Sequence, residues 1–207
     1  MTKNIFLIRH GLATHNIDKK QRGEIAYIDP IHRDSILVEE GIKQAEELNS
    51  ELLLMDFDLV LVSPLTRAIQ TCLAANKNIN KPIISLEYLR EFPCRVHTPN
   101  NRKSKTFLQK KYENIDFSEL LSDEDIFWND IKEETLEELD IRIGKCKDWL
   151  KNRKEENIII FGHASFISRF LGIENDDDIK HCHPYLTQIK GECLQKDSVF
   201  EEIKISY

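Results

Sequence analysis

The sequence lacks an excess of positive charge. Its 207 residues include 29 lysines and arginines against 36 aspartates and glutamates, which gives a formal net charge of −7. Without an overall positive field, the chain is not expected to bind nucleic acid or an anionic membrane surface. Any anion that it binds must therefore be held by a local cluster of groups.

Paired cysteines and long apolar runs are also missing. The five cysteines are odd in number and widely spaced, with no CxxC pair, which argues against a disulfide framework: Cys72, Cys94, Cys146, Cys182 and Cys193. No apolar run has the length of a membrane span, and the run near the N-terminus is too short for a signal peptide. These absences predict a cytoplasmic protein with reduced thiols and no membrane partner.

The chain does contain three short runs that are apolar at every position, at residues 5–8, 59–62 and 158–161. Continuous apolarity is typical of parallel strands that are covered on both faces of a sheet. A weaker run covers residues 82–86. We therefore expect these four segments to form the strands of a buried, mostly parallel sheet.

Helical periodicity separates the predicted strands, at residues 39–55, 63–76 and 135–150. In the second of these, Ser63 is the expected N-cap and Pro64 the expected first helical position. The expected core-facing side chains are Ile42, Ala45, Leu48 and Leu52 in the first helix, and Leu136, Leu139, Ile143, Cys146 and Leu150 in the third. Strands that alternate with helices predict an α/β fold, a three-layer sandwich with helices on both faces of the sheet.

The length, together with an apolar share of 41%, suits one globular domain over residues 1–207. No repeat or linker marks a second domain. Residues 93–130 break the alternation of strands and helices, because they are polar and mix basic, acidic and aromatic side chains. We expect a partly helical, cap-like insertion there, beside the functional site.

A distinctive polar segment follows each strongly predicted strand. The three segments are Arg9-His10-Gly11, Ser63-Pro64-Leu65-Thr66-Arg67 and Gly162-His163-Ala164-Ser165. Ligands of open α/β sheets bind beyond the carboxyl ends of the strands, where helix N-termini add backbone N–H donors. Two arginines, two imidazoles and helix N-termini suit a phosphate better than a carboxylate.

Several of these segments resemble the histidine phosphatase superfamily, in its phosphoglycerate mutase-like branch. The resemblance rests on LIRHGLATHN, SPLTRAIQT, LREF and GHAS, and on DSILVEEGIKQA, which is similar to that branch's LTxxGxxQA segment with Val38 in place of threonine. Residues 90–107 and 116–130 are more loosely similar to an insertion of phosphomutase-like proteins from plants and fungi. The resemblance implies a phosphoglycerate mutase-like fold.

The resemblance also implies roles for individual residues. His10 would be the nucleophile that becomes phosphohistidine, with Arg9, Arg67 and His163 around the transferred phosphoryl group. Glu91 would give a proton to the leaving oxygen, and Asn16 would help to hold phosphate. The substrate-binding candidates are Ala164, which stands where the family often has glycine, and Arg102, which is either a substrate contact or a solvated residue.

The residue types support this chemistry independently. An imidazole has an ordinary pKa of about 6.5, so much of it is an unprotonated nucleophile near neutral pH. Arg9, Arg67 and a protonated His163 can supply the positive charge that magnesium often supplies in phosphoryl transfer. We therefore expect metal-independent catalysis without a cofactor, with Glu91 protonated part of the time so that it can act as an acid.

Some motifs admit two interpretations. His181-Cys182-His183 is either an incomplete zinc motif or, better, part of a loop. Asn101–Lys105 is either a patch that gates an anionic substrate or a solvated surface. His15 and His97 either line the entrance of the site or lie on the surface, and the surface is favoured for His97.

Three functions compete on the sequence alone. The leading hypothesis is a phosphatase that hydrolyses a small phosphorylated substrate. A phosphoglycerate mutase would use the same site, but Phe92-Pro93 stands where mutases have a Tyr-Gly pair, which favours the phosphatase. The third hypothesis is a non-catalytic phosphate-binding module. The sequence predicts neither the particular substrate nor the oligomeric state.

Overall fold

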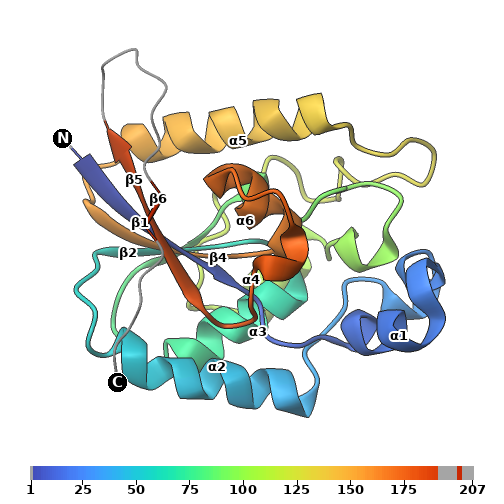
Figure 1. Cartoon of the computed structure of the whole chain (residues 1–207), viewed down its shortest axis with the longest axis horizontal. Helices are drawn as coiled ribbons and strands as arrows, with labels where there is room; N and C mark the ends of the chain where they lie inside the picture. The colour runs from blue at the N-terminus through green and yellow to red at the C-terminus, as the bar shows by residue number, and fades with distance from the viewer. Residues whose placement is uncertain (1, 191–199, 202–207) are drawn as a thin grey trace.

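A six-stranded sheet forms the centre of the computed structural model, which describes residues 2–190 and 200–201 (Figure 1). The strand order is β3-β2-β4-β1-β5-β6. Four strands, β3, β2, β4 and β1, run parallel, whereas β5 is antiparallel to its neighbour β1 and β6 is antiparallel to β5. The strands are β1 (Thr2–Arg9), β2 (Leu59–Val62), β3 (Ile83–Ser85), β4 (Asn157–Gly162), β5 (Pro184–Lys190) and β6 (Phe200–Glu201).

The four predicted strands are all present, and they are the parallel ones. β2 is buried at each of its four positions, and β4 at every position except its first, Asn157, as continuous apolar runs require. The antiparallel pair β5 and β6 was not predicted. In β5, Thr187 and Gln188 interrupt the apolar pattern, and the outer part of the strand is partly exposed, so its sequence resembles a loop.

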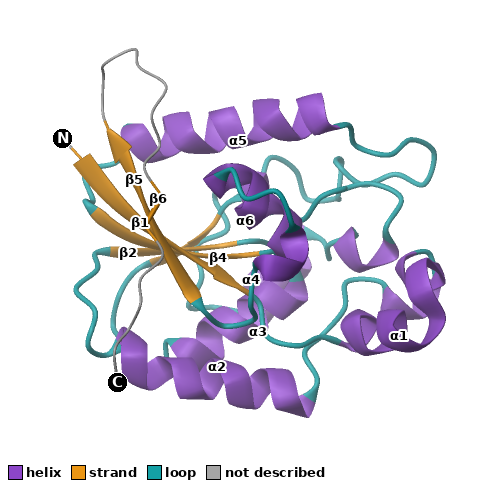
Figure 2. Ribbon diagram, in the orientation of Figure 1, coloured by secondary structure: helices purple, strands orange, loops and turns teal. Residues whose placement is uncertain are grey.

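Helices cover both faces of the sheet (Figure 2). α5 and α6 lie on one face, and α2 and α3 lie on the other. The predicted three-layer α/β fold is therefore confirmed. The α-helices are α1 (Thr14–Arg22), α2 (Glu39–Leu52), α3 (Thr66–Ala75), α4 (Lys105–Lys111), α5 (Leu136–Lys151) and α6 (Ala164–Leu171), and the short 3-10 helices are η1 (Gly23–Tyr27), η2 (Pro30–His32), η3 (Glu87–Leu89), η4 (Thr98–Asn100) and η5 (Asp176–Asp178).

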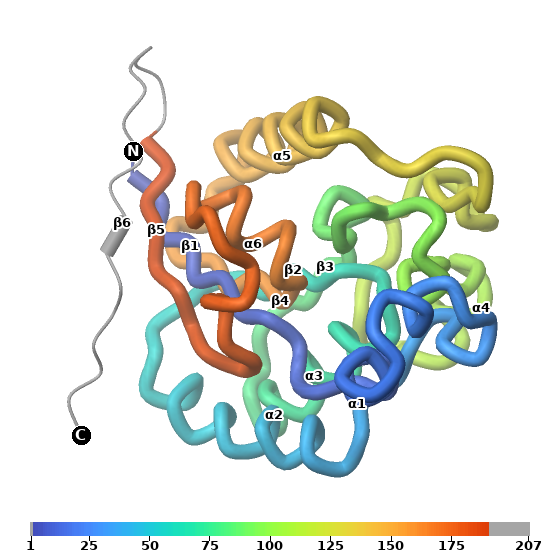
Figure 3. Tube along the Cα trace, turned by 45° about the vertical axis from the view of Figure 1, so that its right-hand side comes forward, coloured from blue at the N-terminus to red at the C-terminus, as the bar shows by residue number. Residues whose placement is uncertain are grey.

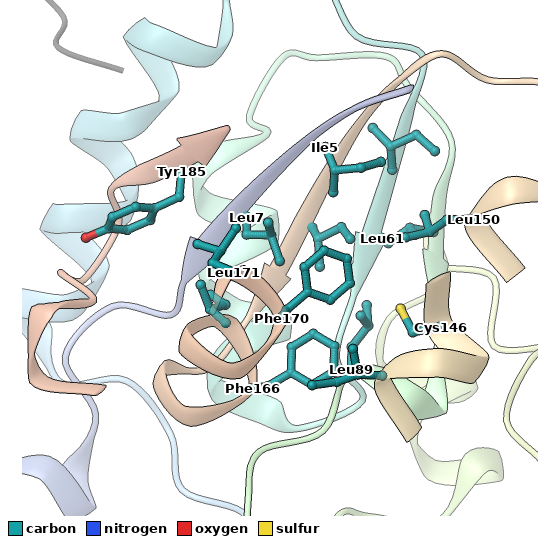
Figure 4. Packing of buried hydrophobic residues seen from close by; sticks show 14 of the residues in the cluster. Ile5, Leu7, Leu61, Leu89, Cys146, Leu150, Phe166, Phe170, Leu171 and Tyr185 are labelled. Atoms are coloured by element: carbon teal, nitrogen blue, oxygen red, sulfur yellow. The ribbon is translucent and has the colours of Figure 1, made fainter. Parts of the chain in front are cut away.

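β1, β2 and β4 each contribute to two hydrophobic cores, because successive side chains point to opposite faces of the sheet. Ile158 and Ile160 of β4 pack with α5 and α6, in the cluster of which Figure 4 shows one part. Ile159 and Phe161 pack with α2 and α3 on the other face. The two cores clamp the sheet and fix the positions of the strand ends, where the polar segments begin.

Two of the side chains expected in the core are exposed. Ile42 retains 40% of its accessible surface, because Gly41 instead faces the backbone of Leu12 at this point of α2. Leu136 retains 51%, because it is the first residue of α5 and lies beyond the end of the packed face. The other members of both predicted stripes are buried.

The helix after β2 begins later than its sequence predicts. α3 starts at Thr66, and its N-cap is Leu65 rather than Ser63. The capping group comes from a distant segment, because the carboxylate of Asp34 accepts hydrogen bonds from both the backbone N–H and the hydroxyl of Thr66. Ser63 is thereby free to bond to a side chain of the candidate site.

Residues 93–130 contain η4 and α4 and are otherwise loop. The segment lies on the same side of the molecule as α1 (Figure 3). It is joined to the sheet by a backbone bridge between Asp116 and β3, and Leu108, Phe117 and Leu120 are buried in the core that contains α2 and α3. The single domain and the cap function of this segment stay predictions.

The four cysteines within the described residues form no disulfide, and Cys193 lies outside those residues. Within the described part of the chain, no helix is both long and apolar enough to cross a membrane.

Candidate active site

The ends of β1, β4 and β2 bring the predicted site residues together. Arg9 is in register with Gly162 of the neighbouring strand, and the backbone N–H of His10 donates to the carbonyl of Gly162 at 3.0 Å. The two histidines that follow these strands therefore face each other, with 5.2 Å between the ring centroids of His10 and His163. The parallel sheet thus produces the predicted pair of imidazoles.

Two hydrogen bonds agree on the tautomer of His10, with the proton on Nδ1. Its Nδ1 lies 2.7 Å from the carbonyl oxygen of Gly11 and donates to it. Its Nε2 accepts from Nε of Arg67 at 3.2 Å, so that nitrogen carries a lone pair. Burial, and then the positive charge of Arg67, hold the pKa of His10 well below its ordinary value. His10 is therefore a neutral imidazole whose lone pair lies on Nε2 and accepts the bond from Arg67.

Two arginines, the buried Arg67 and the partly buried Arg9, flank His10. Arg67, from the first turn of α3, is only 1% exposed, and burial lowers its pKa to about 10, so it remains charged at neutral pH. Arg9 donates from Nη1 to the carbonyl of Ile179 at 2.7 Å, and burial lowers its pKa as well. Neither guanidinium has a salt bridge to a carboxylate among the described residues. Their charge is therefore available to an anion.

His163 lies behind His10 and is fully buried. Its Nε2 lies 2.7 Å from the hydroxyl oxygen of Ser63, and its Nδ1 has no hydrogen-bond partner within the described part of the chain. Burial, followed by the charge of Arg67, holds the pKa of His163 well below its ordinary value. The expected protonated His163 is thus disfavoured in this environment, although a bound dianion would raise its pKa.

Glu91 approaches from the loop after η3. One of its carboxylate oxygens, Oε1, accepts hydrogen bonds from the backbone N–H of Phe92 at 2.8 Å and of Phe166 at 3.2 Å. Burial raises the pKa of Glu91, and the hydrogen bond from Phe92 and the charge of Arg67 oppose that rise. The protonated form is therefore more accessible near neutral pH than for an ordinary glutamate.

Asn16 and Ala164 border the same space. The side-chain oxygen of Asn16 accepts from the backbone N–H of Ala13 at 3.0 Å, which fixes the start of α1. Ala164 is the first residue of α6, whose first-turn N–H groups have no partner within the helix. A helix N-terminus of this kind favours bound anions.

These groups surround a cavity of about 740 Å³, a size typical of pockets for small molecules. It is lined by six of the eight predicted site residues: Arg9, His10, Asn16, Arg67, Glu91 and Ala164. His163 does not line it, although its ring centroid lies 5.2 Å from that of His10. Arg102 does not line it.

Arg102 is 2% exposed and is occupied by the protein itself. Its guanidinium donates to both carboxylate oxygens of Glu87, at 3.1 and 3.2 Å, and to four backbone carbonyls, including those of Ser122 and Asp123. Arg102 therefore anchors the loop at residues 120–125 through these hydrogen bonds. The sequence around Arg102 does not predict that its side chain is buried, because most of the carbonyl groups that accept from it lie about 20 residues further along the chain.

Two further histidines line the cavity. The side-chain N–H of Asn16 donates to Nε2 of His15, whose ring centroid lies 6.0 Å from that of His10. His181 donates from Nδ1 to the carbonyl of His10 at 2.6 Å, and burial lowers its pKa to about 4. His181 belongs to a loop whose contact with β1 is visible only in three dimensions.

Four further residues of the cavity lining were not predicted from the sequence to lie there: Lys19, Tyr27, His97 and Asn100. His97 was favoured as a surface residue, but it lines the cavity and stacks on Tyr27 with 4.6 Å between ring centroids. Lys19 lies over the other side of this stack, with Nζ 5.0 Å from the centroid of Tyr27. Asn100, from η4, lines the cavity beside Arg67.

The His181-Cys182-His183 motif does not assemble a metal site. Over residues 2–190 and 200–201, no group of three or more His, Cys, Asp or Glu side chains is arranged to hold a metal ion. Cys182 adopts a positive φ of 51°, and its backbone N–H donates to the carbonyl of Arg9 at 2.9 Å. His183 packs edge-on against Tyr185. Of the two histidines in the motif, His181 lines the cavity and His183 does not.

The fold is a phosphoglycerate mutase-like α/β fold, and the histidines that follow β1 and β4 lie together at the carboxyl edge of its sheet. The chain belongs to the histidine phosphatase superfamily, branch 1, whose family model matches residues 5–184. The sequence is 30% identical to phosphoglycerate mutase-like protein 1 of Arabidopsis thaliana over 214 residues, which cover 88% of this chain and 74% of that protein.

Two solved structures illustrate the likeness of fold. A putative alpha-ribazole-5'-P phosphatase of Escherichia coli superposes with a TM-score of 0.64 at 20% identity, covering 97% of this chain and 95% of that one. A phosphoglycerate mutase of Bacillus anthracis gives a TM-score of 0.62 at 16% identity, covering 98% and 92%. The same fold thus occurs in a protein described as a phosphatase and in one described as a mutase.

Proposed function

We propose that this protein hydrolyses a small phosphomonoester through a phosphohistidine intermediate on His10. The observation that carries the proposal is the tautomer of His10. The bonds to Gly11 and Arg67 leave the lone pair on Nε2, beside a buried guanidinium and at the wall of the cavity. A neutral nucleophile beside an uncompensated cation suits attack on an anionic ester.

The reaction proceeds in two displacements. Nε2 of His10 attacks phosphorus and the ester P–O bond breaks, while protonated Glu91 gives its proton to the leaving oxygen. Water then attacks the phosphohistidine, the P–N bond breaks, and Glu91 takes the proton from that water. The raised pKa of Glu91 fits this alternation between acid and base.

In this proposal the positive charge comes from the protein. Arg9 and Arg67 lie at the cavity wall without carboxylate partners, and they would bind the equatorial oxygens of the phosphoryl group. The reaction would then need neither a metal ion nor a cofactor. Activity that survives a chelator tests this point directly.

The leaving group is a small organic molecule in this proposal. A cavity of about 740 Å³ holds far more than a phosphate ion. Its mouth combines the aromatic stack of Tyr27 and His97 with exposed charges of both signs, such as Lys19 and Asp177. These groups suit a polar, partly flat leaving group.

Mutase chemistry is the rival proposal, supported by the name of the Arabidopsis relative. Phe92 and Pro93 line the cavity directly after Glu91, where the sequence pattern of mutases differs. A time course with 3-phosphoglycerate separates the two activities. Free phosphate supports the phosphatase, whereas 2-phosphoglycerate that appears without free phosphate supports the mutase.

The decisive experiment incubates the full chain with a panel of phosphomonoesters, with and without a chelator, and follows free phosphate. His10→Ala is expected to lower turnover by about 10⁴-fold or more, because it removes the nucleophile. His183→Ala is the matched control and should retain turnover, because His183 is outside the cavity lining. Rapid quenching without acid should trap phosphohistidine in the wild-type chain only.

Two results would refute the proposal. Turnover that persists in His10→Ala would move the nucleophile to another residue, with His163 as the first to test. The absence of both turnover and phosphohistidine across the whole panel would favour a non-catalytic phosphate-binding module.

A further inference from the structure

The buried arginines of this protein fall into two groups according to their partners. Arg90 and Arg102 are fully buried, and both donate to the carboxylate of Glu87. Arg90 also forms a two-point ion pair with Asp125, at 2.5 and 2.8 Å. Such pairs are the usual way in which a buried charge is compensated.

Arg67 is buried to the same degree but has only uncharged partners. Its Nη1 donates to the carbonyl of Pro99 at 2.6 Å, and its Nη2 donates to Oδ1 of Asn100 at 2.8 Å. Its Nε donates to His10. No salt bridge within residues 2–190 and 200–201 includes Arg67. Burial lowers the pKa of Arg67 and the charges of Glu91 and Asp34 oppose this, but neither carboxylate is hydrogen-bonded to the guanidinium.

Asn100 is held in one orientation. Its Nδ2 donates to the carbonyl of Pro93 at 2.8 Å, so Oδ1 must be the atom that faces Arg67. Its backbone carbonyl accepts from Arg90, which Asp125 holds in turn. Asn100 is 2% exposed and borders the cavity. A chain of fixed contacts therefore runs from the core of the insertion to the guanidinium beside His10.

We propose that Asn100 is a positioning residue that orients Arg67 with an uncharged oxygen and so leaves its full positive charge to a bound phosphoryl group. This inference rests on the proposed function. A carboxylate at the same position would hold the guanidinium equally well, but it would repel the phosphoryl group and compete with it for the same N–H donors. The amide supplies the geometry without this competition.

The inference changes the role of the insertion. The sequence predicts an insertion at residues 93–130 beside the site, with Arg102 as a candidate substrate contact, but Arg102 instead anchors the loop at 120–125. Their contact with the site is made by Pro99 and Asn100, through Arg67. The insertion thus acts on the phosphoryl group by holding a residue that binds it.

The test compares Asn100→Asp and Asn100→Ala with wild type. Asn101→Asp is the matched control, because it adds the same charge at the next residue, whose side chain accepts a hydrogen bond from Arg33 at 3.4 Å and does not line the cavity. Calorimetry with inorganic phosphate measures binding without turnover, and kcat and KM are measured separately with a phosphomonoester. Thermal unfolding reports whether each variant is folded.

Asn100→Asp is expected to weaken phosphate binding about tenfold or more, because the charge of Arg67 is then compensated. Asn101→Asp should stay within about twofold of wild type. Asn100→Ala leaves the charge of Arg67 intact but removes its acceptor, so kcat should fall about tenfold while phosphate affinity changes less. A merely structural role would lower thermal stability in both Asn100 variants and leave phosphate affinity unchanged.

Phosphate binding by Asn100→Asp that equals wild type would overturn the inference and leave the proposed function intact. If that variant does not fold, Asn100→Ala decides, and a wild-type kcat would overturn the inference. A wild-type chain that shows no turnover but binds phosphate refutes the proposed function, and the binding comparison still tests Asn100. A wild-type chain that neither turns over substrate nor binds phosphate refutes both.

Discussion

Three buried nitrogen atoms near His10 have no hydrogen-bond partner within the described part of the chain: Nε of Arg9, Nδ1 of His15 and Nδ1 of His163. A buried polar group without a partner typically costs about 1–3 kcal/mol of stability. Arg9 and His15 both line the cavity, so a ligand bound there can supply partners for their unpaired nitrogens. At the scale of the residue, these unpaired nitrogens therefore lower the stability of the folded protein.

The chemistry of Glu91 gives a prediction at the same scale. Because burial raises the pKa of Glu91, the free enzyme should keep the required acid protonated at mildly acidic pH and lose it as pH rises. The lowered pKa of His10 keeps the nucleophile unprotonated at the same mildly acidic pH. We expect kcat/KM to be highest below neutral pH and to fall on the alkaline side.

Glu91→Gln checks this assignment. The alkaline fall in kcat/KM should disappear, and activity towards an alkyl phosphate should drop about 10²- to 10⁴-fold. A nitrophenyl phosphate should be affected much less, because its leaving group needs no proton. An equal loss for both substrates would show that Glu91 does not act as the acid.

At the scale of the element, two glycines decide how α2 meets the loop after β1. A Cβ at Gly11 would lie 2.3 Å from the carbonyl oxygen of Gly41, and a Cβ at Gly41 would lie 2.1 Å from that of Leu12. Both obstacles are backbone atoms, which cannot move aside like a flexible side chain. Gln44 adds a hydrogen bond at 3.0 Å from the backbone N–H of Leu12. The helix therefore holds the loop that carries His10.

Gly41→Ala is expected to destabilise the protein by roughly 1–3 kcal/mol or more and to lower activity, because the loop must shift. Gly144→Ala is the matched control within α5, where an added Cβ meets nothing within 4 Å. It should stabilise by about 0.5–1 kcal/mol through helix propensity. Urea unfolding measures both values, and equal effects of the two changes would contradict the close approach.

At the scale of the whole molecule, burial of imidazoles links folding to pH. Burial is the largest cause of the lowered pKa values of His10, His15 and His163. The unfolded chain takes up a proton at each of them below about pH 6.5, whereas the folded chain does so only at lower pH. Their contribution to stability is therefore complete above pH 6.5 and is lost as pH falls below it.

Each of these three histidines should lower the free energy of unfolding by about 1.4 kcal/mol for each pH unit below about 6.5, until the folded protein also takes up the proton. Asp34 and Glu91, whose pKa values burial raises, act in the opposite sense but are fewer. We expect clearly lower stability at pH 5.5 than at pH 7.5 in urea unfolding. Added phosphate should reduce the difference, because the anion favours protonated imidazoles. A stability that does not change with pH would contradict the burial of neutral histidines.

The predicted strands and the order of the polar segments came from local patterns and agree with the structure. An apolar run such as residues 158–161 predicts a buried strand from local sequence alone, because a strand covered on both faces needs an apolar residue at every position. The start of α3 could not be predicted, since its cap, Asp34, lies 32 residues away. The position of Arg102 could not be predicted either, because it depends on Glu87 and on carbonyls about 20 residues further along the chain.

The sequence by itself determined the parallel sheet, the family and the set of groups at the ends of its strands, because each of these depends on residues close together in the chain. Only the tertiary structure decided which tautomer His10 adopts, that burial lowers the pKa of His163, and that Arg67 donates to an amide rather than to a carboxylate. The physical reason is that pKa values and hydrogen-bond partners depend on burial and on neighbours from distant segments, which folding alone brings together.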